Sequence, residues 1–326
     1  MKVLWVSSFP KNGIGHKVFL ERQLTKMAEK TVTVDIFSTG SLYSAIKFLG
    51  ARRRLKELAQ DYDLVHAQWG SGCGFLVSTI PGVKVITLRG SDWYGSGGVG
   101  ELPNRFREFI GSLLTKVSLR KFSQVIVVSN RMSDEVAKIV NRSNLSCIPT
   151  AIDLDDVKPV SDKQALKTLG LKEKAGPYIL FVSSARNYPV KRRFLAISAF
   201  ERVKQFIPNA QFIEITDKPR KEIFAYMSLS DVLLITSVHE GWPNVVKEAL
   251  ACNLPFVSTD VSDLRLIAQN TENCFIADAT EEALANAIMK CIQSGPQPHL
   301  RKFVKNMSLS ITASQTLRVY KKALSR

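Results

Sequence analysis

The stretch VLLITSVHEGWPNVVKEALACNLPFVS, residues 232–258, contains the pattern that decides the fold. It begins with a short apolar run, Val232–Ile235, and ends with a second one, Pro255–Ser258. Pro243 suits the first turn of a helix, because the N–H that proline lacks has no intrahelical partner there. The segment between the runs is therefore expected to include a helix that connects two buried parallel strands. Strand, helix and parallel strand in succession form the repeating unit of doubly wound α/β domains.

Short apolar runs of the same kind recur along the whole chain. They are rich in Val and Ile and continuous rather than alternating, which is typical of parallel strands covered by helices on both faces. In the first half they are Val3–Val6, Val32–Phe37, Leu64–Ala67, Val83–Leu88, Gln124–Val128 and Leu145–Ile148. In the second half they are Tyr178–Val182, Gln211–Ile215, Val232–Ile235, Pro255–Ser258 and Cys274–Ala277. Longer segments such as Lys17–Glu29 and Ser41–Gln60 have the length of crossover helices.

These two series predict two Rossmann-like domains, each with a doubly wound parallel sheet. The length of 326 residues agrees, at roughly 150 residues per domain. A polar stretch, Asp153–Gly176, separates the two series. We expect a first domain over residues 1–160, a second over 161–305, and a C-terminal helix over 306–326 that packs back across the junction.

The composition is that of a globular protein, with 45% hydrophobic and 23% charged residues. Its five cysteines are odd in number and contain no CxxC pair, which favours buried thiols in a reducing compartment over disulfides or a zinc site. The first apolar run is too short for a signal peptide, and no run of about 18 apolar residues occurs that could span a bilayer. We expect a cytoplasmic protein.

The charge balance is strongly basic: 45 Lys and Arg against 29 Asp and Glu give a net charge of +16. Residues 1–150 carry most of the excess, with 21 basic and 11 acidic residues. Such a field favours a polyanion, an anionic membrane surface or a phosphate-bearing small molecule. The sequence has no helix-turn-helix, zinc or aromatic RNA-binding signature, so we expect no nucleic-acid partner.

Ligands of open parallel sheets bind beyond the carboxyl ends of the strands, where residues 237–248 follow the run at 232–235. The N–H groups of Asn244 and Val245 fall at the predicted start of a helix, where they would be unpaired donors for an anion or sugar hydroxyls. Glu240 precedes this helix, and Glu248 lies one turn beyond Asn244 on the same face. Alternatively, Glu240 is a surface residue and Glu248 a helix residue without further role.

A second candidate loop follows the first run, where Gly13 and Gly15 precede a predicted helix. Glycines there would let the backbone approach an anion at the helix N-terminus. The spacing is only GxG, with Val18 at the place of a third glycine, so a tight strand-to-helix turn is an equal alternative.

The segment HEGWPNVVKEALACNLPFVSTDV, residues 239–261, resembles the E-x7-E signature of retaining glycosyltransferases of family 4, which have the GT-B fold. Other segments are similar to this family in the same order along nearly the whole chain. They are the Gly13/Gly15 loop and residues 63–70, 87–92, 148–153, 181–184 and 189–191.

This resemblance implies two Rossmann-like domains that face each other across a cleft, with the acceptor held by the first and the donor by the second. Such enzymes move a sugar from a nucleoside diphosphate sugar to an acceptor hydroxyl, keep the anomeric configuration, and need no metal or other cofactor for the chemistry. Glu240 would contact the sugar near its reacting carbon, and Glu248 would bind the ribose. Lys191 would meet the diphosphate, with Arg186 or Arg192 nearby. Backbone donors would come from Gly241, Trp242, Pro243, Asn244 and Val245.

Two positions depart from the family pattern. Arg89 stands where the family commonly has a histidine, and Ser183–Ser184 stand where it usually has Gly-Arg. An arginine cannot act as a base because it stays protonated, but it could steady a phosphate or an acidic acceptor. Together with Glu240, the candidate catalytic residues are Arg89 and His66, and a structural histidine is an equal alternative for His66. Asp92 is a candidate for binding an acceptor hydroxyl, with a helix N-cap as its alternative.

Basic residues also gather beside apolar ones on two predicted helices of the first domain. One cluster comprises Lys47, Arg52, Arg53, Arg54 and Lys56; the other comprises Arg105, Arg107, Lys116, Arg120 and Lys121. Cationic helices with an apolar face can rest on anionic lipid headgroups, and solvated faces of core helices are an even alternative.

We therefore expect a retaining glycosyltransferase that uses a nucleotide sugar to extend a glycan or lipid-linked glycan of the cell surface, at the inner face of the membrane. The alternatives are another GT-B enzyme, such as a sugar-nucleotide epimerase or a phosphorylase, and a basic nucleic-acid-binding protein.

Overall fold

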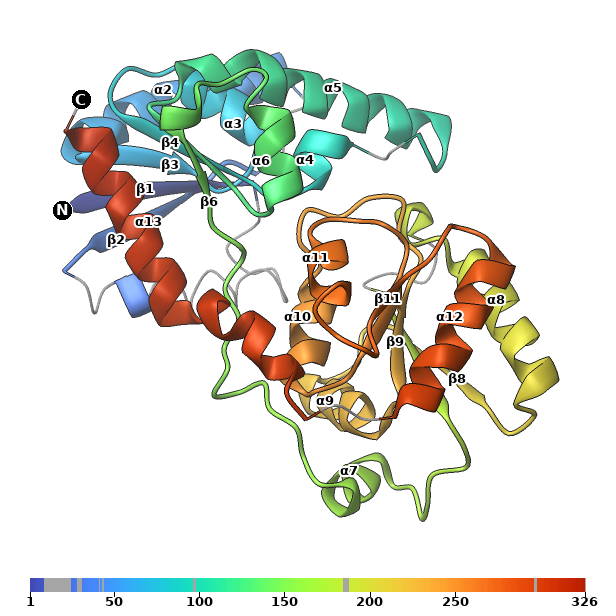
Figure 1. Ribbon diagram of the computed structural model, residues 1–326. Coiled ribbons are helices and arrows are strands. Elements are labelled where there is room, and N and C mark those ends of the chain that lie inside the picture. Colours follow the sequence, from blue (N-terminus) through green and yellow to red (C-terminus); the bar gives the residue numbers. More distant parts are fainter. Residues whose placement is uncertain are drawn as a thin grey trace. The chain divides into compact units, whose positions relative to one another are not determined.

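The computed structural model describes residues 1–8, 25–27, 31–40, 42, 44–95, 98–183, 188–295 and 298–325. The chain divides into two compact units (Figure 1). The first consists of Met1–Ala151 and Met307–Arg326, and the second of Ile152–Asn306. The boundary between the two units thus lies at residues 151–152, whereas the sequence prediction placed it at 160–161. The reason is that the polar stretch 153–176 is part of the second unit and contains a helix, α7 (Asp162–Leu169).

The first unit contains a six-stranded parallel sheet with the order β2-β1-β3-β4-β5-β6. Its strands are β1 (Lys2–Ser7), β2 (Thr33–Ser38), β3 (Leu64–Ala67), β4 (Lys84–Leu88), β5 (Gln124–Val127) and β6 (Leu145–Cys147). Each corresponds to one predicted apolar run, with ends that shift by no more than a residue or so. The agreement follows from burial, since β1, β3 and β5 are covered almost completely.

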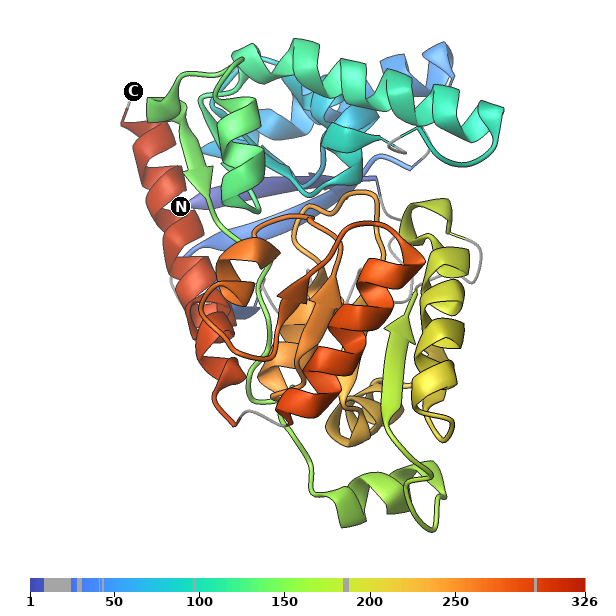
Figure 2. The same cartoon turned by 45° about the vertical axis from the view of Figure 1, so that its right-hand side comes forward.

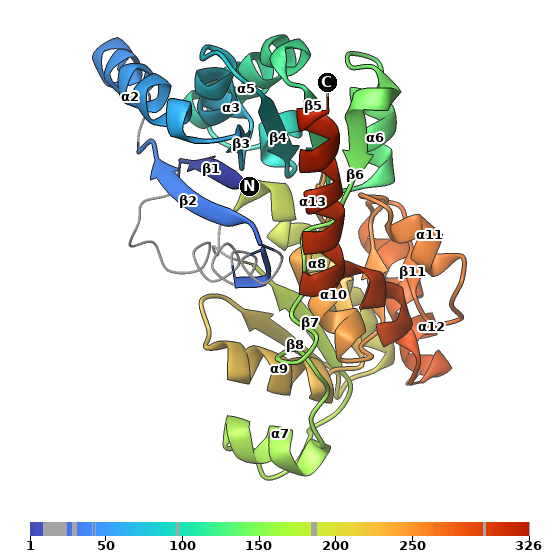
Figure 3. The same cartoon turned by 90° about the vertical axis from the view of Figure 1, so that its left-hand side faces the viewer.

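Helices cover both faces of this sheet. α3 (Ser71–Ser78) packs against β1, β3 and β4, and its neighbours α2 (Ala45–Leu58) and α5 (Leu102–Ser118) contact α3. α13 (Leu309–Leu324) lies on the opposite face, where Tyr320 and Val319 join Trp5 and Val85 in one apolar core (Figure 3). The shorter helices are α4 (Ser91–Tyr94) and α6 (Asn130–Val136), with 3-10 turns at Ala59–Asp61, Leu119–Lys121 and Arg142–Asn144.

The second unit contains a five-stranded parallel sheet with the order β11-β10-β9-β7-β8 (Figure 2). Its strands are β7 (Tyr178–Val182), β8 (Gln211–Ile215), β9 (Val232–Ile235), β10 (Phe256–Ser258) and β11 (Phe275–Ile276). α8 (Arg193–Phe206) and α12 (Glu281–Ser294) cover one face. The remaining helices are α7, α9 (Arg220–Leu229), α10 (Asn244–Ala251) and α11 (Leu264–Ala268), with 3-10 helices at Pro189–Lys191 (η4) and Leu300–Met307 (η5).

Arg301 fastens the start of the second unit to α10. Its Nη1 donates to the carbonyl oxygens of Val157 (2.7 Å) and Ala251 (2.8 Å), and its Nη2 donates to that of Leu154. The side chain thereby joins segments about 150 residues apart in the sequence, which keeps the start of the unit beside α10.

All five cysteines are free thiols, and all but the half-buried Cys147 are buried, as the sequence predicted. None of the helices formed by the described residues is both long enough and apolar enough to cross a membrane.

Candidate functional site

The candidate site of the second unit forms where the loop 236–243 follows β9. α10 begins at Asn244, and Pro243 is the residue just before it, with φ −67° and ψ 116°. The first bonds of the helix run from the N–H groups of Val246 (3.1 Å) and Lys247 (3.4 Å) to the carbonyl of Pro243. The N–H groups of Asn244 and Val245 precede these bonds, so they lie at the partly positive end of the helix. No described side chain caps this end.

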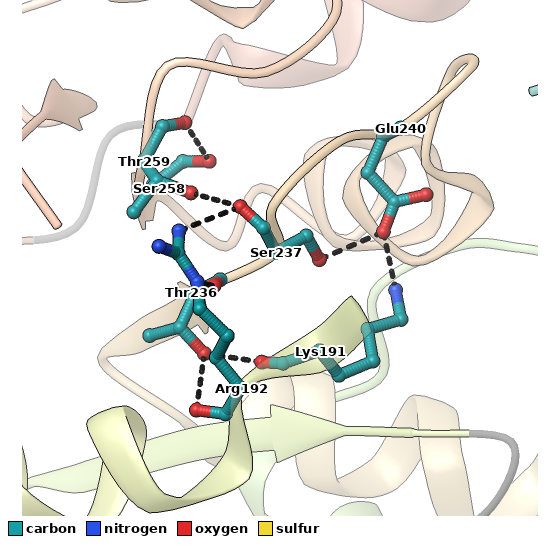
Figure 4. Close-up of polar contacts among 7 residues, drawn as sticks. All are labelled: Lys191, Arg192, Thr236, Ser237, Glu240, Ser258 and Thr259. Atoms are coloured by element: carbon teal, nitrogen blue, oxygen red, sulfur yellow. Dashed lines mark hydrogen bonds and ion pairs between the residues drawn. The ribbon is translucent and has the colours of Figure 1, made fainter. Parts of the chain in front are cut away.

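Glu240 forms the polar centre of this loop (Figure 4). Its Oε1 accepts hydrogen bonds from Lys191 Nζ at 2.6 Å and from Ser237 Oγ at 2.8 Å. The Lys191 and Glu240 side chains are only 16% and 17% exposed, so their charges interact through a medium that screens less than bulk water does. The structure thus brings together the two residues expected at the reacting sugar and at the diphosphate.

Arg192 supports this arrangement from the junction of η4 and α8. Its backbone is in the left-handed region, with φ 47°. The guanidinium donates to the carbonyls of Thr236 (Nε, 2.5 Å) and Ser237 (Nη2, 2.8 Å), and burial lowers its pKa. Arg192 was predicted near the diphosphate. In the structure its two hydrogen bonds hold the loop at Thr236 and Ser237.

Hydroxyl groups that no sequence motif predicts hold the same loop from several sides. Thr236 Oγ1 donates to the carbonyl of Lys191 at 2.6 Å, and Thr259 Oγ1 donates to that of Ser237 at 2.7 Å. Ser262 Oγ donates to the carbonyl of Gly241, also at 2.7 Å. Single serines and threonines carry no motif, so only the three-dimensional contacts reveal that they position Glu240.

Glu248 lies in the second turn of α10. Arg220 Nη1 approaches its Oε1 at 3.4 Å, while Arg220 Nη2 approaches Asp156 Oδ2 at 3.3 Å. Burial raises the pKa of the Glu248 carboxyl, and the positive charges of Arg220 and Lys247 oppose that effect in part. Lys247 itself is buried, with its Nζ 5.5 Å from the ring centroid of Trp242. The Trp242 side chain is also buried, which leaves the backbone as the part of Trp242 suited to donor binding.

The candidate residues of the first unit form a separate group. His66 is buried between Tyr320 and Thr87, with its Nδ1 2.6 Å from Tyr320 Oη and its Nε2 2.8 Å from Thr87 Oγ1. Gln68 Nε2 also lies 3.0 Å from Nδ1, so the neutral ring that accepts at Nδ1 and donates from Nε2 satisfies all three contacts. Burial, helped by the charge of Arg89, lowers the pKa of His66 to about 3. These contacts support the structural alternative for His66.

Arg89 and Asp92 are held just beyond β4. Both carboxylate oxygens of Asp92 accept bonds from backbone N–H groups: those of Gly70 (2.8 Å), Gly90 (2.9 Å) and Arg89 (3.0 Å). Burial raises the pKa of the Asp92 carboxyl, and these three amide bonds and Arg89 oppose the shift. The Arg89 guanidinium donates to the carbonyl and side-chain oxygens of Gln68, both at 2.9 Å, and burial lowers its pKa to about 10. Asp92 is the second residue of α4, and the N-cap of this helix is Gly90, so Asp92 is not the helix N-cap of its alternative. Its carboxylate instead holds the backbone of residues 70, 89 and 90 before the helix.

Three candidate residues, Gly13, Gly15 and Arg186, lie outside the described residues, as does Ser184. Within the described ranges, no three or more His, Cys, Asp and Glu side chains gather closely enough to hold a metal ion. The described part of the site therefore offers an ion pair, a helix N-terminus and backbone amides, which suit a negatively charged ligand.

Comparison with known proteins gives this geometry a biochemical setting. A family model described as Glycosyltransferase Family 4 matches residues 7–156, and one described as Glycosyl transferases group 1 matches residues 198–294. Among solved structures, Alr3699/HepE of Anabaena in complex with UDP and glucose is similar in fold, with a TM-score of 0.73 and 16% identity over 98% of this chain and 99% of that one. The chain is a glycosyltransferase with the GT-B fold.

The names of two curated relatives state a pathway or a substrate. TuaC of Bacillus subtilis, assigned to teichuronic acid biosynthesis as a glycosyltransferase, is 23% identical over 89% of both chains. The UDP-Gal:alpha-D-GlcNAc-diphosphoundecaprenol alpha-1,3-galactosyltransferase of Escherichia coli is 22% identical over 46% of both chains.

Proposed function

We propose that this glycosyltransferase is a retaining enzyme of the family 4 type. It transfers a sugar from a nucleoside diphosphate sugar to a glycan or lipid-linked glycan acceptor during synthesis of a cell-surface polysaccharide. The observation that carries the proposal is the ion pair of Glu240 and Lys191 beside the N-terminus of α10. The relative assigned to teichuronic acid synthesis and the relative acting on a diphosphoundecaprenol-linked sugar support the class of acceptor.

The arrangement suits departure of a nucleoside diphosphate. Negative charge develops on the diphosphate as the glycosidic bond breaks, and groups fixed in advance around that position stabilise the transition state more than the ground state. Lys191 supplies a full charge there, and the amides of Asn244 and Val245 supply the positive end of a helix. We propose that these groups carry out the charge stabilisation that the reaction needs, without a metal ion.

Glu240 and Glu248 take different parts in this proposal. Glu240 is held by Lys191 and Ser237, so its second oxygen, Oε2, is the atom we assign to the transferred sugar. Glu248 lies deeper on α10, and we assign it to the ribose hydroxyls of the donor, where it would act as hydrogen-bond acceptor. Arg220, which contacts Glu248 at 3.4 Å, orients that carboxylate.

The substitution Glu240→Gln tests the proposal. It keeps the size of the side chain but removes the charge that pairs with Lys191, so sugar transfer should be abolished while nucleotide affinity changes only a few-fold. Glu214→Gln is a matched control, because Glu214 is 16% exposed and paired with Arg193 at 2.6 Å in the same unit. The measurements are transfer of labelled sugar, release of nucleoside diphosphate, and the anomeric configuration of the product by NMR.

Unchanged turnover of Glu240→Gln would contradict the assignment of Glu240 to the transferred sugar. A product with inverted anomeric configuration would contradict the retaining mechanism. The donor is found first, by thermal shift with UDP, GDP, ADP and CMP compounds. A nucleotide present at 100 times its dissociation constant should stabilise the fold by about 2.7 kcal/mol. Loss of both donor binding and transfer in Glu214→Gln as well would show that the effect is structural.

A further inference from the structure

Helix α5 has its two faces the opposite way round from an ordinary surface helix. The residues buried against the first unit are hydroxyl-bearing: Ser112, Thr115 and Ser118. The large apolar residues are exposed instead: Leu102, Phe106, Phe109, Leu113 and Val117. Surface helices of globular proteins normally turn their apolar stripe toward the core, so this exposed row needs another explanation.

Specific hydrogen bonds fix the orientation of α5. Thr115 Oγ1 accepts from the N–H of Ser71 at 2.6 Å, and Ser112 Oγ donates to the carbonyl of Trp93 at 2.6 Å. Gly111 brings the helix close to α3, since a Cβ added there would lie 2.8 Å from Ser71 Oγ. Rotating the helix to bury its apolar row would break these bonds and leave buried polar groups unpaired.

The exposed row is continuous. At 100° per residue its five members fall within an arc of roughly 80°, and at 1.5 Å per residue they span about 22 Å. Leu102, Phe106 and Phe109 are 76%, 66% and 64% exposed. Singly scattered apolar residues on a surface need no explanation, but a contiguous stripe of this length marks an interaction site.

Basic side chains border the row. Arg105 and Lys116 lie along one edge and Arg107 lies toward the other, and all three are exposed. α2 packs against α3 as α5 does (Figure 3). It also has apolar residues, Ile46 and Leu49, exposed beside Arg53. Residues 1–150, which contain both helices, have a net charge of +10.

We propose that α5 is a membrane-docking helix, which inserts its apolar row between the headgroups of an anionic bilayer while its basic borders contact the lipid phosphates. A helix lying in the interface needs this combination of an apolar face and flanking cations. A second copy of the chain is a poorer occupant, because apposed α5 helices would bring Arg105 and Lys116 of each copy close together. The proposal goes beyond sugar transfer and does not depend on the assignment of Glu240.

Vesicle co-sedimentation of the full chain tests this without any sugar substrate. The protein should pellet with phosphatidylcholine vesicles that contain about a third phosphatidylglycerol, bind pure phosphatidylcholine weakly, and dissociate as salt is raised. The double substitution Phe106→Ser/Phe109→Ser should lower partitioning at least roughly tenfold, because two aromatic side chains no longer leave water. Phe194→Ser/Phe206→Ser is the matched control, since these residues are 78% and 70% exposed in the second unit.

Equal partitioning of wild type and Phe106→Ser/Phe109→Ser would overturn the proposal, as would equal binding to neutral and anionic vesicles. Light scattering of the free protein provides a second readout. A dimer that Phe106→Ser/Phe109→Ser converts to monomer, together with no vesicle binding, would assign the row to self-association and reject the membrane. The substituted residues are exposed, so thermal melting of the double variant should match that of wild type.

Discussion

His66, Tyr320 and Trp5 are joined by hydrogen bonds inside the first unit, although Trp5 and Tyr320 are 315 residues apart in sequence. Trp5 Nε1 donates to Tyr320 Oη at 2.9 Å, and the Tyr320 hydroxyl donates to His66 Nδ1. Because both ring nitrogens of His66 have neutral partners, the ring has no group to stabilise its protonated form, and the folded protein keeps it uncharged.

This network predicts a pH-dependent stability that belongs to His66. The pKa of His66 is lowered from 6.5 to about 3 on folding, so between these values the unfolded chain binds a proton that the folded chain does not. The contribution of His66 is fully present above pH 6.5 and is lost as the pH falls toward 3. The free energy of unfolding should fall by about 1.4 kcal/mol per pH unit in this window on account of His66.

Urea unfolding at several pH values measures this effect. The slope should be shallower by about that amount in His66→Gln, which has no titrating group, even if the variant is less stable at every pH. His299→Gln is the control, because His299 is exposed and lies in the second unit. Parallel pH profiles for His66→Gln and wild type would contradict the prediction.

The sequence singled out Glu240 by its place before a predicted helix and Lys191 by the resemblance to a glycosyltransferase family, and the structure pairs the two side chains. Their roles stay predictions. The sequence could not identify the role of His66, since that depends on a tyrosine 254 residues away. Ser237, Thr236 and Thr259 were missed for the same reason: a hydroxyl becomes a positioning group only when the fold brings a carbonyl or carboxylate to it.

At the scale of elements, the strands were predictable and the helix orientations were not. β3, β7, β8 and β9 begin and end at the predicted residues. For β7 and β9 the reason is that a strand buried on both faces is apolar throughout, whereas β8 is a half-buried edge strand. α5 shows the opposite case. Its apolar period identifies a helix correctly, but the buried side is the one with Gly111 and Thr115. Hydrophobic periodicity shows that one face of a helix is apolar, but not whether that face meets the protein core or another apolar environment.

Two glycines in helices should respond in opposite ways to alanine. Gly50 in α2 has nothing within 4 Å of an added Cβ, so Gly50→Ala should raise the free energy of unfolding by about 0.5–1 kcal/mol. In α5, an added Cβ at Gly111 would lie 2.8 Å from Ser71 Oγ and 3.3 Å from Ser71 Cβ. Gly111→Ala should therefore lower it by about 1–2 kcal/mol, because α5 and α3 must move apart.

Thermal or urea unfolding of the two variants side by side measures this difference. Both substitutions make the same chemical change inside a helix, so helix propensity cancels in the comparison. Stabilisation of similar size in both variants would show that α3 and α5 do not pack as closely as described.

At the scale of the whole molecule, the first unit depends on a helix that follows the entire second unit in the chain. α13 contributes Ala313, Val319, Tyr320 and Ala323 to the core around β1, and all four are at most 5% exposed. The predicted helix over 306–326 is therefore seen as α13 within the first unit, with its first residue at Leu309. The sequence suggested that this helix packs back across the junction, but not which face of the first sheet it covers.

A chain that ends at Asn306 should keep the second unit folded and lose the first. α13 buries Val319 and Tyr320 and covers Val3, Trp5 and Val85 in the same core. Full burial of each such side chain is worth about 1.5–3 kcal/mol, so loss of this burial is comparable with the whole stability of a domain, about 5–15 kcal/mol. Hydrogen exchange should show fast exchange of the β1 and β3 amides and retained protection of β7 and β9. Tyr320→Phe is the milder comparison, since it removes only the hydroxyl and should cost about 1–2 kcal/mol. Protected β1 amides in the shortened chain would contradict the prediction.

The late position of α13 also sets an order of events on the ribosome. Domains generally fold as units while the chain emerges, with the N-terminal one first. Here residues 152–306 emerge before residues 309–324, so the second unit can begin to fold while one face of the first sheet still lacks its cover. The part of the chain made first is completed last, and during that interval Trp5 and Val3 lie on an uncovered apolar sheet that a chaperone can bind.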